Sequence, residues 1–236
     1  MAKIWTRDMR VHFGGYDIGT ATTRVAMFQG VDSLDRTAFT DGAERVLSGV
    51  RRDRIEWAGL FDDDNSHDAA MSSLIGSGTN NVFSVFFGTG TGGIAYVGTS
   101  LLTLGKPSGE VGGLVRQDGA FQPDNQILRG VHYGTATNYD FALGGNSGTH
   151  DNTTATTAGG TLFMHAFGSV TTGSGSVTLE DSADGTTFAA LGTRVEAVTA
   201  RTAQRVNIGG TIRRYTRLGA VNGTGTLGIV LILVRA

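Results

Sequence analysis

Short apolar runs alternate with turn residues along the whole chain, and this pattern predicts a mainly β protein. In the segment 54–57, Arg-Ile-Glu-Trp, polar and apolar side chains alternate, which is the period of a strand with one buried face. Similar runs predict strands in the first half at 22–31, 51–61, 82–88, 92–105 and 110–122. In the second half they predict strands at 161–170, 175–182, 186–199, 204–210, 211–221 and 226–236.

One segment departs from the strand pattern and predicts a short α-helix over 67–76. Met71, Leu74 and Ile75 fall at positions i, i+3 and i+4, which places them in a narrow apolar stripe on one helix face. Gly76 can end the helix. We therefore expect one short helix packed on a sheet.

Turn signals separate the expected strands. In the second half they are Asp184-Gly185, the segment 207–210 and Asn222-Gly223. In the first half, the segment 106–109 (Lys-Pro-Ser-Gly) is expected to divide two strands. The longest apolar run, 227–234, is far shorter than the ~20 residues with which a helix spans a bilayer, so it predicts a buried strand and no membrane partner.

The composition supports a folded, turn-rich protein that assembles without covalent links. Glycine occurs 37 times against 2 prolines, which fits many tight turns. With 19 basic and 21 acidic residues the formal charge is −2, so the chain has no positive field for holding nucleic acid tightly. The absence of cysteine excludes disulfides and thiolate metal sites. The segment 1–13 contains no apolar stretch of the kind a secretion signal needs, so no such signal is expected.

Motifs that resemble chemical sites lack the context that the chemistry needs. Gly88, Gly90 and Gly93 match G-x-G-x-x-G, but a strand pattern follows instead of a helix, which favours a hairpin turn. The acidic cluster 62–68 offers oxygen ligands, yet His67 stands where a calcium-binding loop requires glycine, which favours a solvated turn. Neither paired histidine motifs nor a G-x-S-x-G motif occurs. We expect no catalytic residue, cofactor or metal, and no enzyme.

A group of arginines in the second half raises the question of phosphate binding. Few aromatic side chains are interleaved with them, which favours a solvated or subunit-contact role over a grip on nucleic acid. The group comprises Arg201, Arg205, Arg213, Arg214 and Arg217.

A change in composition divides the chain into three parts. The segment 134–160 is rich in threonine, glycine and asparagine and cannot build much core alone, so it predicts a linker or loop. The segment 1–133 is then a first β domain, and 161–236 a C-terminal β-sandwich domain.

The order of these pieces is similar to a known family. The segments 37–42 (Thr-Ala-Phe-Thr-Asp-Gly), 47–50 (Leu-Ser-Gly-Val) and 107–112 (Pro-Ser-Gly-Glu-Val-Gly), with the short helix between them, resemble the major tail tube protein of long-tailed, siphovirus-like bacteriophages. This likeness covers about residues 15 to 130. The segments 177–192 and 204–221 resemble the second domain found at the end of many phage tail proteins.

The resemblance implies a tail-tube-like β-sandwich or barrel with one short helix, followed by a β-sandwich on the outside of an assembly. Subunits would close into hexameric rings that stack into a hollow tube through which the genome passes to the host. Partners would be copies of the chain and other tail proteins such as tape measure, terminator and tip proteins, with DNA passing only transiently. The location would be the virion tail, assembled in the host cytoplasm.

The resemblance also implies which segment makes subunit contacts. The segment 37–50 would be a long loop that reaches a neighbouring subunit or ring, and it mixes apolar with charged side chains. The expected interface residues are Thr37, Phe39, Asp41, Glu44, Arg45, Val46 and Leu47. Ring closure agrees with a general property of open sheets, whose edges carry unpaired backbone groups that pairing between subunits satisfies.

An adhesin module that binds carbohydrate or a cell surface is the alternative. It would need exposed, coplanar aromatic rings in the second half. Phe163, Phe167, Phe188 and Tyr215 are instead spaced as core residues, which favours the structural interpretation.

Overall fold

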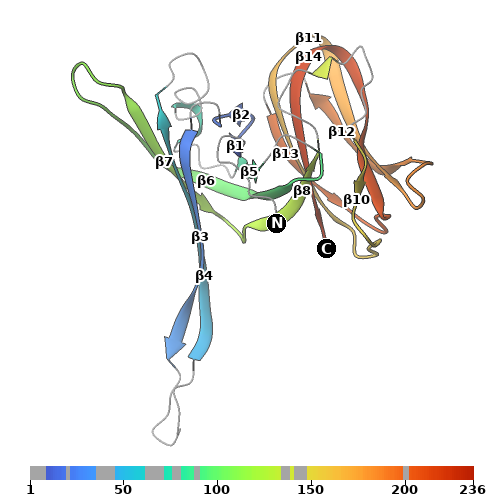
Figure 1. The fold of residues 1–236 in the computed structure, drawn as a ribbon, viewed down its shortest axis with the longest axis horizontal. Helices are drawn as coiled ribbons and strands as arrows, with labels where there is room; N and C mark the ends of the chain where they lie inside the picture. The colour runs from blue at the N-terminus through green and yellow to red at the C-terminus, as the bar shows by residue number, and fades with distance from the viewer. Residues whose placement is uncertain are drawn as a thin grey trace, which may run out of the picture.

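The computed structural model describes residues 9–19, 22–35, 46–61, 72–75, 81–87, 91–133, 139–140, 148–198 and 202–236 (Figure 1). Its strands form a 14-stranded sheet, and all pairs among the described strands are antiparallel. The mainly β class predicted from the sequence is confirmed.

The first half of the chain builds two layers around one core. Its strands are β1 (Met9–Phe13), β2 (Tyr16–Asp17), β3 (Thr22–Asp35), β4 (Val46–Leu60), β5 (Asn81–Phe87), β6 (Ile94–Ser108), β7 (Arg116–Pro123) and β8 (Leu128–Tyr133). Strands β3, β4, β7 and β6 pair in that order, and β6 continues into β5, β1 and β2. Phe13 and Phe83 from the second group pack with Ile55, Trp57 and Phe121 from the first.

The alternation of polar and apolar residues along β4 determines which of its side chains face this core. Ile55 and Trp57 are buried, whereas Arg54 is exposed, as the polar–apolar alternation predicts. Gly119 lies opposite Trp57 in β7. A Cβ at position 119 would lie 2.3 Å from the indole ring, so glycine is required there for the ring to lie flat on the sheet.

The second half is a β-sandwich built on one long hairpin. Its strands are β9 (Tyr139–Asp140), β10 (His150–Asp151), β11 (Gly160–Ser182), β12 (Ala189–Val198), β13 (Thr202–Ile208) and β14 (Tyr215–Arg235). Strands β11 and β14 pair from Gly160↔Arg235 to Ser182↔Tyr215 and curve over the top of the molecule (Figure 1). At one end of this hairpin, β11 pairs with β13 and β14 pairs with β8. At the other end, β11 pairs with β12 and β14 pairs with β10. The two ends therefore form two layers.

The apolar run near the C-terminus is buried on both faces of its strand. Leu231 and Leu233 point into the sandwich core with Leu162 and Met164. Alternate residues of β14 point to a second core, the junction cluster, which is shared with the first half. The junction cluster comprises Val82, Phe86, Ala95, Val97, Phe163, Val230 and Ile232. A strand covered on both sides needs a continuous apolar sequence, and this is what 227–234 supplies.

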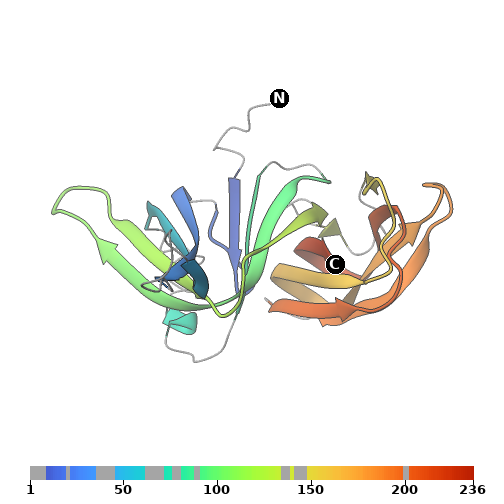
Figure 2. The ribbon, with the colours of Figure 1, turned by 90° about the horizontal axis from the view of Figure 1, so that it is seen from below.

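The two halves are joined by hydrogen-bonded strands as well as by the junction cluster. Strand β8 pairs with β6 through Ile94↔Val131 and with β14 through Val131↔Leu233, so the sheet passes from one half into the other (Figure 2). The described parts of the segment 134–160 also contact the second half, because β9 and β10 pair with β14. The division into domains at 133 and 160 stays a prediction.

Some expected strand breaks are wrong. Asn222-Gly223 is not a turn: Asn222 lies within β14, opposite Ser176 of β11. The break expected between 170 and 175 is likewise absent, because β11 is continuous there and only its register shifts. Pairing along more than twenty residues outweighs the local preference for a turn, and the surplus residues are absorbed as bulges where the hairpin bends. Strand β6 similarly continues to Ser108.

The expected helix is described only in part. Residues 72–74 are helical, whereas 62–71 and 76–80, including Met71, lie outside the described residues. Leu74 packs against the core of the first half, as expected, and the Ser73 hydroxyl lies 3.1 Å from the Tyr16 hydroxyl. The expectation for Ile75 is wrong, because its side chain is exposed.

Candidate assembly interface

A two-stranded arm projects from the first half of the molecule (Figure 1). We define the arm as residues 30–35 of β3 and 46–52 of β4, which pair with each other. The pairing of β4 with β7 starts only at Ile55, closer to the body of the molecule. Val31 and Val50 expose their side chains on it, Val50 at 71%. An exposed apolar surface on a projecting element is typical of a contact with another subunit.

The structure describes only two of the predicted interface residues, Val46 and Leu47, and these only by their backbones. Thr37, Phe39, Asp41, Glu44 and Arg45 lie outside the described residues. The backbones of Val46 and Leu47 begin β4, opposite Asp35 and Leu34 of β3. The expectation of a loop over 37–50 is therefore wrong for 46–50, which are strand.

A buried carboxylate fixes the root of the arm. Asp53 is 4% exposed, and its Oδ2 accepts hydrogen bonds from the Ile127 amide at 2.9 Å and from Nε of Arg51 at 2.8 Å. The Gln122 side chain donates to the Asp53 carbonyl oxygen at 2.8 Å. These bonds hold β4 against the connection between β7 and β8, so the arm leaves the body in a fixed direction.

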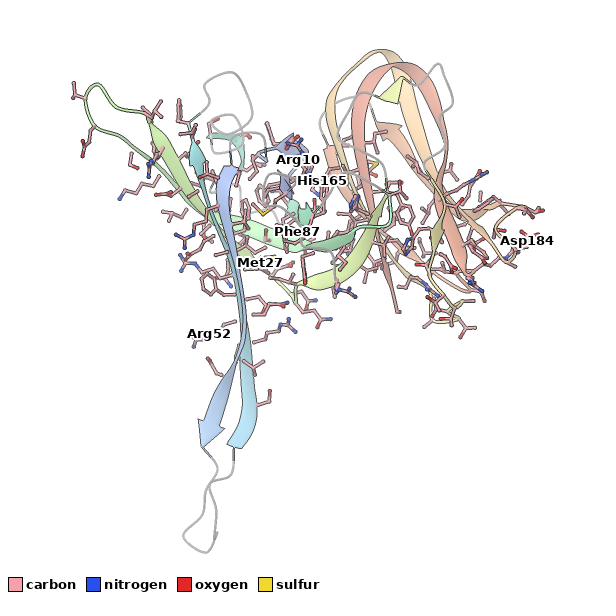
Figure 3. The ribbon with its side chains drawn as sticks, in the orientation of Figure 1. Arg10, Met27, Arg52, Phe87, His165 and Asp184 are labelled. Carbon is pink, nitrogen blue, oxygen red and sulfur yellow. The ribbon has the colours of Figure 1, made fainter. Side chains whose placement is uncertain are left out.

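An ion pair stiffens the arm itself. Nε of Arg52 lies 2.8 Å from Oδ2 of Asp32 on the opposite strand. Figure 3 shows Arg52 on the projecting hairpin, well away from Met27 at its base. The pair is largely solvated and contributes little to stability, up to about 1 kcal/mol.

The sheet that carries the arm has two open edges. Among the described strands, β3 pairs with β4 alone, and β6 beyond Ser100 pairs with β7 alone. Pro107, which has no amide hydrogen to donate, lies in this part of β6, and proline inside a sheet is found essentially only at such edges. Two free edges on one sheet are the geometry from which a closed ring of copies can be built.

The tip of the β6–β7 hairpin is a second projecting apolar surface. We define the tip as residues 109–115, where Gly112 turns the chain at a φ of 82°. Val111 and Leu114 are exposed there, Leu114 at 75%, and Val115 is exposed as well. The strands below it are paired as far as Ser108↔Arg116, so these side chains are carried on a rigid support.

The outer face of the same sheet carries charges of both signs. A shallow pocket of ≈ 280 Å³ opens there, with Ala58 and Ala120 in its lining. Its charged residues include Glu56, whose Oε1 lies 2.9 Å from Nε of Arg54, and Asp118. This mixed lining resembles a contact surface more than a reaction site.

Three of the second-half arginines face carboxylates of the same chain. Arg214 donates two hydrogen bonds to Asp151, at 2.7 and 2.6 Å. Nη2 of Arg217 lies 2.8 Å from Glu180. The pairing with Arg214 holds the pKa of Asp151 at about 2, below its usual value. Arg213, by its backbone amide, binds Asp181 at 2.8 Å. Arg201 lies outside the described residues.

The motifs that were weighed for chemistry take simple structural roles where they are described. Gly93 ends a turn between the paired strands β5 and β6, and its carbonyl oxygen accepts a hydrogen bond from the His132 amide at 3.0 Å. Gly88, Gly90 and the acidic cluster 62–68 lie outside the described residues. Within the described ranges, no three histidine, aspartate or glutamate side chains are placed to hold a metal ion. No described helix has the length and hydropathy to cross a bilayer.

The aromatic side chains described in the second half do not form an exposed platform. Phe163 is buried at 1% exposure. The guanidinium of Arg217 covers the ring of Phe188 at 3.9 Å, and that of Arg214 covers Tyr215 at 4.9 Å. A carbohydrate site built on stacked aromatic rings is therefore not favoured among these residues.

Comparison with known proteins gives matches in structure but not in sequence families. No family model and no curated protein matches the chain. One similar solved structure is the tail of an empty gene transfer agent particle with C6 symmetry: TM-score 0.44, 19% identity, 53% of this chain and 97% of that chain. Another is the SPP1 tail tube, which matches with a TM-score of 0.46 and 16% identity over 54% of this chain and 78% of that chain.

A third solved structure matches over nearly the whole chain. It is the SPP1 Dit protein, described as a hub of the adsorption apparatus of phages that infect Gram-positive hosts. The TM-score is 0.36 and the identity 12%, over 97% of this chain and 99% of that chain. All three TM-scores lie below 0.5, so the function proposed next is based on the chain's own sequence and geometry.

Proposed function

We propose that this chain is a non-enzymatic structural subunit of a phage tail tube, whose copies close into rings that stack around a hollow lumen. The observation that carries the proposal is the four-stranded sheet β3–β4–β7–β6, which has no further partner at either edge among the described strands and bears a projecting arm. The resemblance of the segments 37–42, 47–50 and 107–112 to tail tube proteins supports it.

The strand directions allow the ring to close without a mismatch. Each neighbouring pair in β3–β4–β7–β6 is antiparallel, so β3 and β6 run in opposite directions. When β3 of one copy lies beside residues 101–106 of β6 in the next, that contact is antiparallel too. The head-to-tail contact repeats around a ring and removes both open edges. Six copies are the proposed number.

The charge of the chain suits passage of a genome. The formal charge is −2, and the outer face of the open sheet carries Glu56 and Asp118 as well as arginines. A strongly basic wall would hold the phosphate backbone through counterion release and slow its movement. In this function DNA is a transient occupant, and the lasting partners are copies of the chain and the tape measure, terminator and tip proteins of the same virion tail, assembled in the host cytoplasm.

Electron microscopy of the concentrated protein tests the proposal. We expect rings with a central opening, and short stacks of rings, in negatively stained samples. Sedimentation should show a species of several copies that grows with concentration. A protein that stays monomeric at every concentration in both measurements would overturn the proposal.

Engineered cysteines test the pairing of open edges. The chain has no cysteine of its own, so Phe28→Cys in β3 can be combined in turn with Leu101→Cys, Thr103→Cys or Leu104→Cys in β6. In at least one combination, oxidation should give a ladder of covalent multimers that ends at the ring number, because a disulfide needs Cα atoms about 4.4 to 6.8 Å apart. Non-reducing electrophoresis measures the ladder.

A matched control combines Phe28→Cys with Thr186→Cys, an exposed position in the second half. This variant should give no ladder. Rings visible by microscopy without a ladder from any of the three test combinations would show that the ring closes through other surfaces.

The tip of the β6–β7 hairpin is proposed to contact a second copy, because it continues β6, whose edge closes the ring. Replacing Val111 and Leu114 with serine should weaken assembly about tenfold or more, since each apolar side chain buried in a contact contributes roughly 1 kcal/mol or above. The melting temperature of the dilute protein should stay unchanged, because both side chains are exposed. Sedimentation over a concentration series measures the change, and unaltered assembly would contradict the contact.

A further inference from the structure

Three histidines are completely buried where the two halves meet. His12 lies on β1, His132 on β8 and His165 on β11, and all three are 0% exposed. Histidine side chains are seldom buried to this extent, because burial opposes their charged form. Figure 3 shows His165 and Arg10, which precedes His12 on β1, at this junction.

The rings form a row together with one phenylalanine. The ring centres of His165 and His12 are 5.5 Å apart, and those of His12 and Phe86 are 5.2 Å apart with the planes nearly parallel at 3°. Phe86 and His132 follow at 4.7 Å. Phe86 belongs to the junction cluster. The row therefore connects the first half, through β1 and β5, with β11 of the second.

Among the described residues, the charged groups placed near the row are Arg10 and Asp17. Arg10 lies beside His12 on the same strand, and Oδ1 of Asp17 on β2 is 3.6 Å from Nε2 of His12. From β13, the guanidinium of Arg205 lies 5.8 Å from the ring centre of Phe163. The residues that β5, β6 and β14 contribute to the junction cluster are all apolar. Within the part of the chain that the structure describes, a proton taken up by His12 has the Asp17 carboxylate nearby and the Arg10 guanidinium against it.

These surroundings keep His12 and His165 neutral in the closed structure. Burial, followed by Arg10 and His132, lowers the pKa of His12 from 6.5 to about 3, which outweighs the nearby Asp17. Burial, followed by His12, lowers the pKa of His165 well below 6.5. Once the junction opens, both side chains meet water and regain ordinary proton affinity.

We propose that the histidine row is an acid-sensitive latch, which holds β1 and β5 against β11 while the imidazoles are neutral and lets these layers part when they are protonated. The sign follows from the lowered pKa values. The stability of the closed junction is fully present above pH 6.5 and is lost progressively as the pH falls toward the folded-state values. The latch belongs to the fold of one subunit, so it does not depend on the proposed function.

The expected size of the effect is large. Each histidine that titrates near 6.5 when exposed and far lower when buried raises the opening equilibrium constant about thirtyfold between pH 8 and pH 5. His12 and His165 together give about a thousandfold. Opening should be local, because the opposite face of β1 and β5, with Val11, Phe13 and Phe83, packs in the core around Trp57.

Hydrogen–deuterium exchange tests the latch directly. In the intact chain, after correction for the intrinsic pH dependence of exchange, β5 and residues 160–166 of β11 should lose protection between pH 7.5 and pH 5, before β4 and β7 do. The double variant His12→Gln with His165→Gln should lose most of this pH dependence. His150→Gln, which changes a half-buried histidine outside the row, should behave as the unchanged protein does.

Two outcomes would overturn the latch. One is an unchanged protein whose junction stays protected down to pH 5, and the other is a double variant as acid-sensitive as the unchanged protein. Should the double variant not fold, NMR titration of the unchanged protein decides. The His12 and His165 ring signals of the closed form should not shift between pH 8 and pH 6, and titration near 6.5 with the junction closed would reject the latch.

Discussion

Replacing Val46 and Leu47 together with serine should abolish long tubes while the subunit still folds. Both residues lie at the far end of the projecting hairpin, where β3 and β4 pair only with each other. Removing two apolar side chains from a buried contact reduces the free energy of association by roughly 2 to 5 kcal/mol. Since a tube repeats the contact at every subunit of every ring, such a loss is multiplied along its length.

The measurement combines circular dichroism with electron microscopy. The spectrum should match that of the unchanged protein, while stacks of rings should be missing from the images. A control variant, Ile75→Ser with Ile94→Ser, replaces two exposed apolar residues away from the arm and should form stacks normally. Full-length stacks from the Val46 and Leu47 variant would refute the role of the arm in assembly.

Phe163→Ala should be the most destabilising single substitution at the junction. Phe163 is 1% exposed and packs in the junction cluster, which has residues of both halves around it. Truncating a buried phenylalanine costs about 3 to 5 kcal/mol, because it removes apolar contacts and leaves a cavity. In a chain of this size the melting temperature should fall by roughly 6 to 20 °C.

Calorimetry or thermal circular dichroism of dilute protein measures this change. Phe28→Ala is the matched control, since it removes the same atoms from a side chain that is half exposed on β3. Its melting temperature should change by a small fraction of the Phe163 effect. Equal shifts for the two variants would mean that the junction cluster contributes no special stability.

Local patterns in the sequence predict those parts of the fold that local chemistry controls. The D-G signal is confirmed as a turn: Gly185 has a φ of 76°, and the Asp184 carboxylate accepts hydrogen bonds from the amides of Thr186 and Thr187. These bonds hold the pKa of Asp184 well below its usual range. The alternation at 54–57 likewise gives the correct buried face for β4, because both signals act between neighbouring residues.

Features that depend on distant partners were not predictable in this way. Asn222-Gly223 has the composition of a turn, but its strand is held by pairing with β11, almost fifty residues earlier. The carboxylate of Asp53 at the root of the arm was also missed. A signal was present, since Asp53 stands at the inward position of a strand between Arg52 and Arg54, which both face solvent. The open edges appear only once the strand order is known.

The pairing of β8 with β14 has a consequence for synthesis in the cell. Val131 and Leu233 lie about a hundred residues apart in the chain, and a ribosome needs roughly 5 to 20 s to make that length. During this interval β8 has no second neighbour and the junction lacks Val230 and Ile232. Contacts that span long sequence separations form late. Nascent chains on the same messenger RNA therefore expose incompletely covered, aggregation-prone sheets to each other. Production of this subunit should depend strongly on chaperones that shield nascent β-strands until β14 emerges.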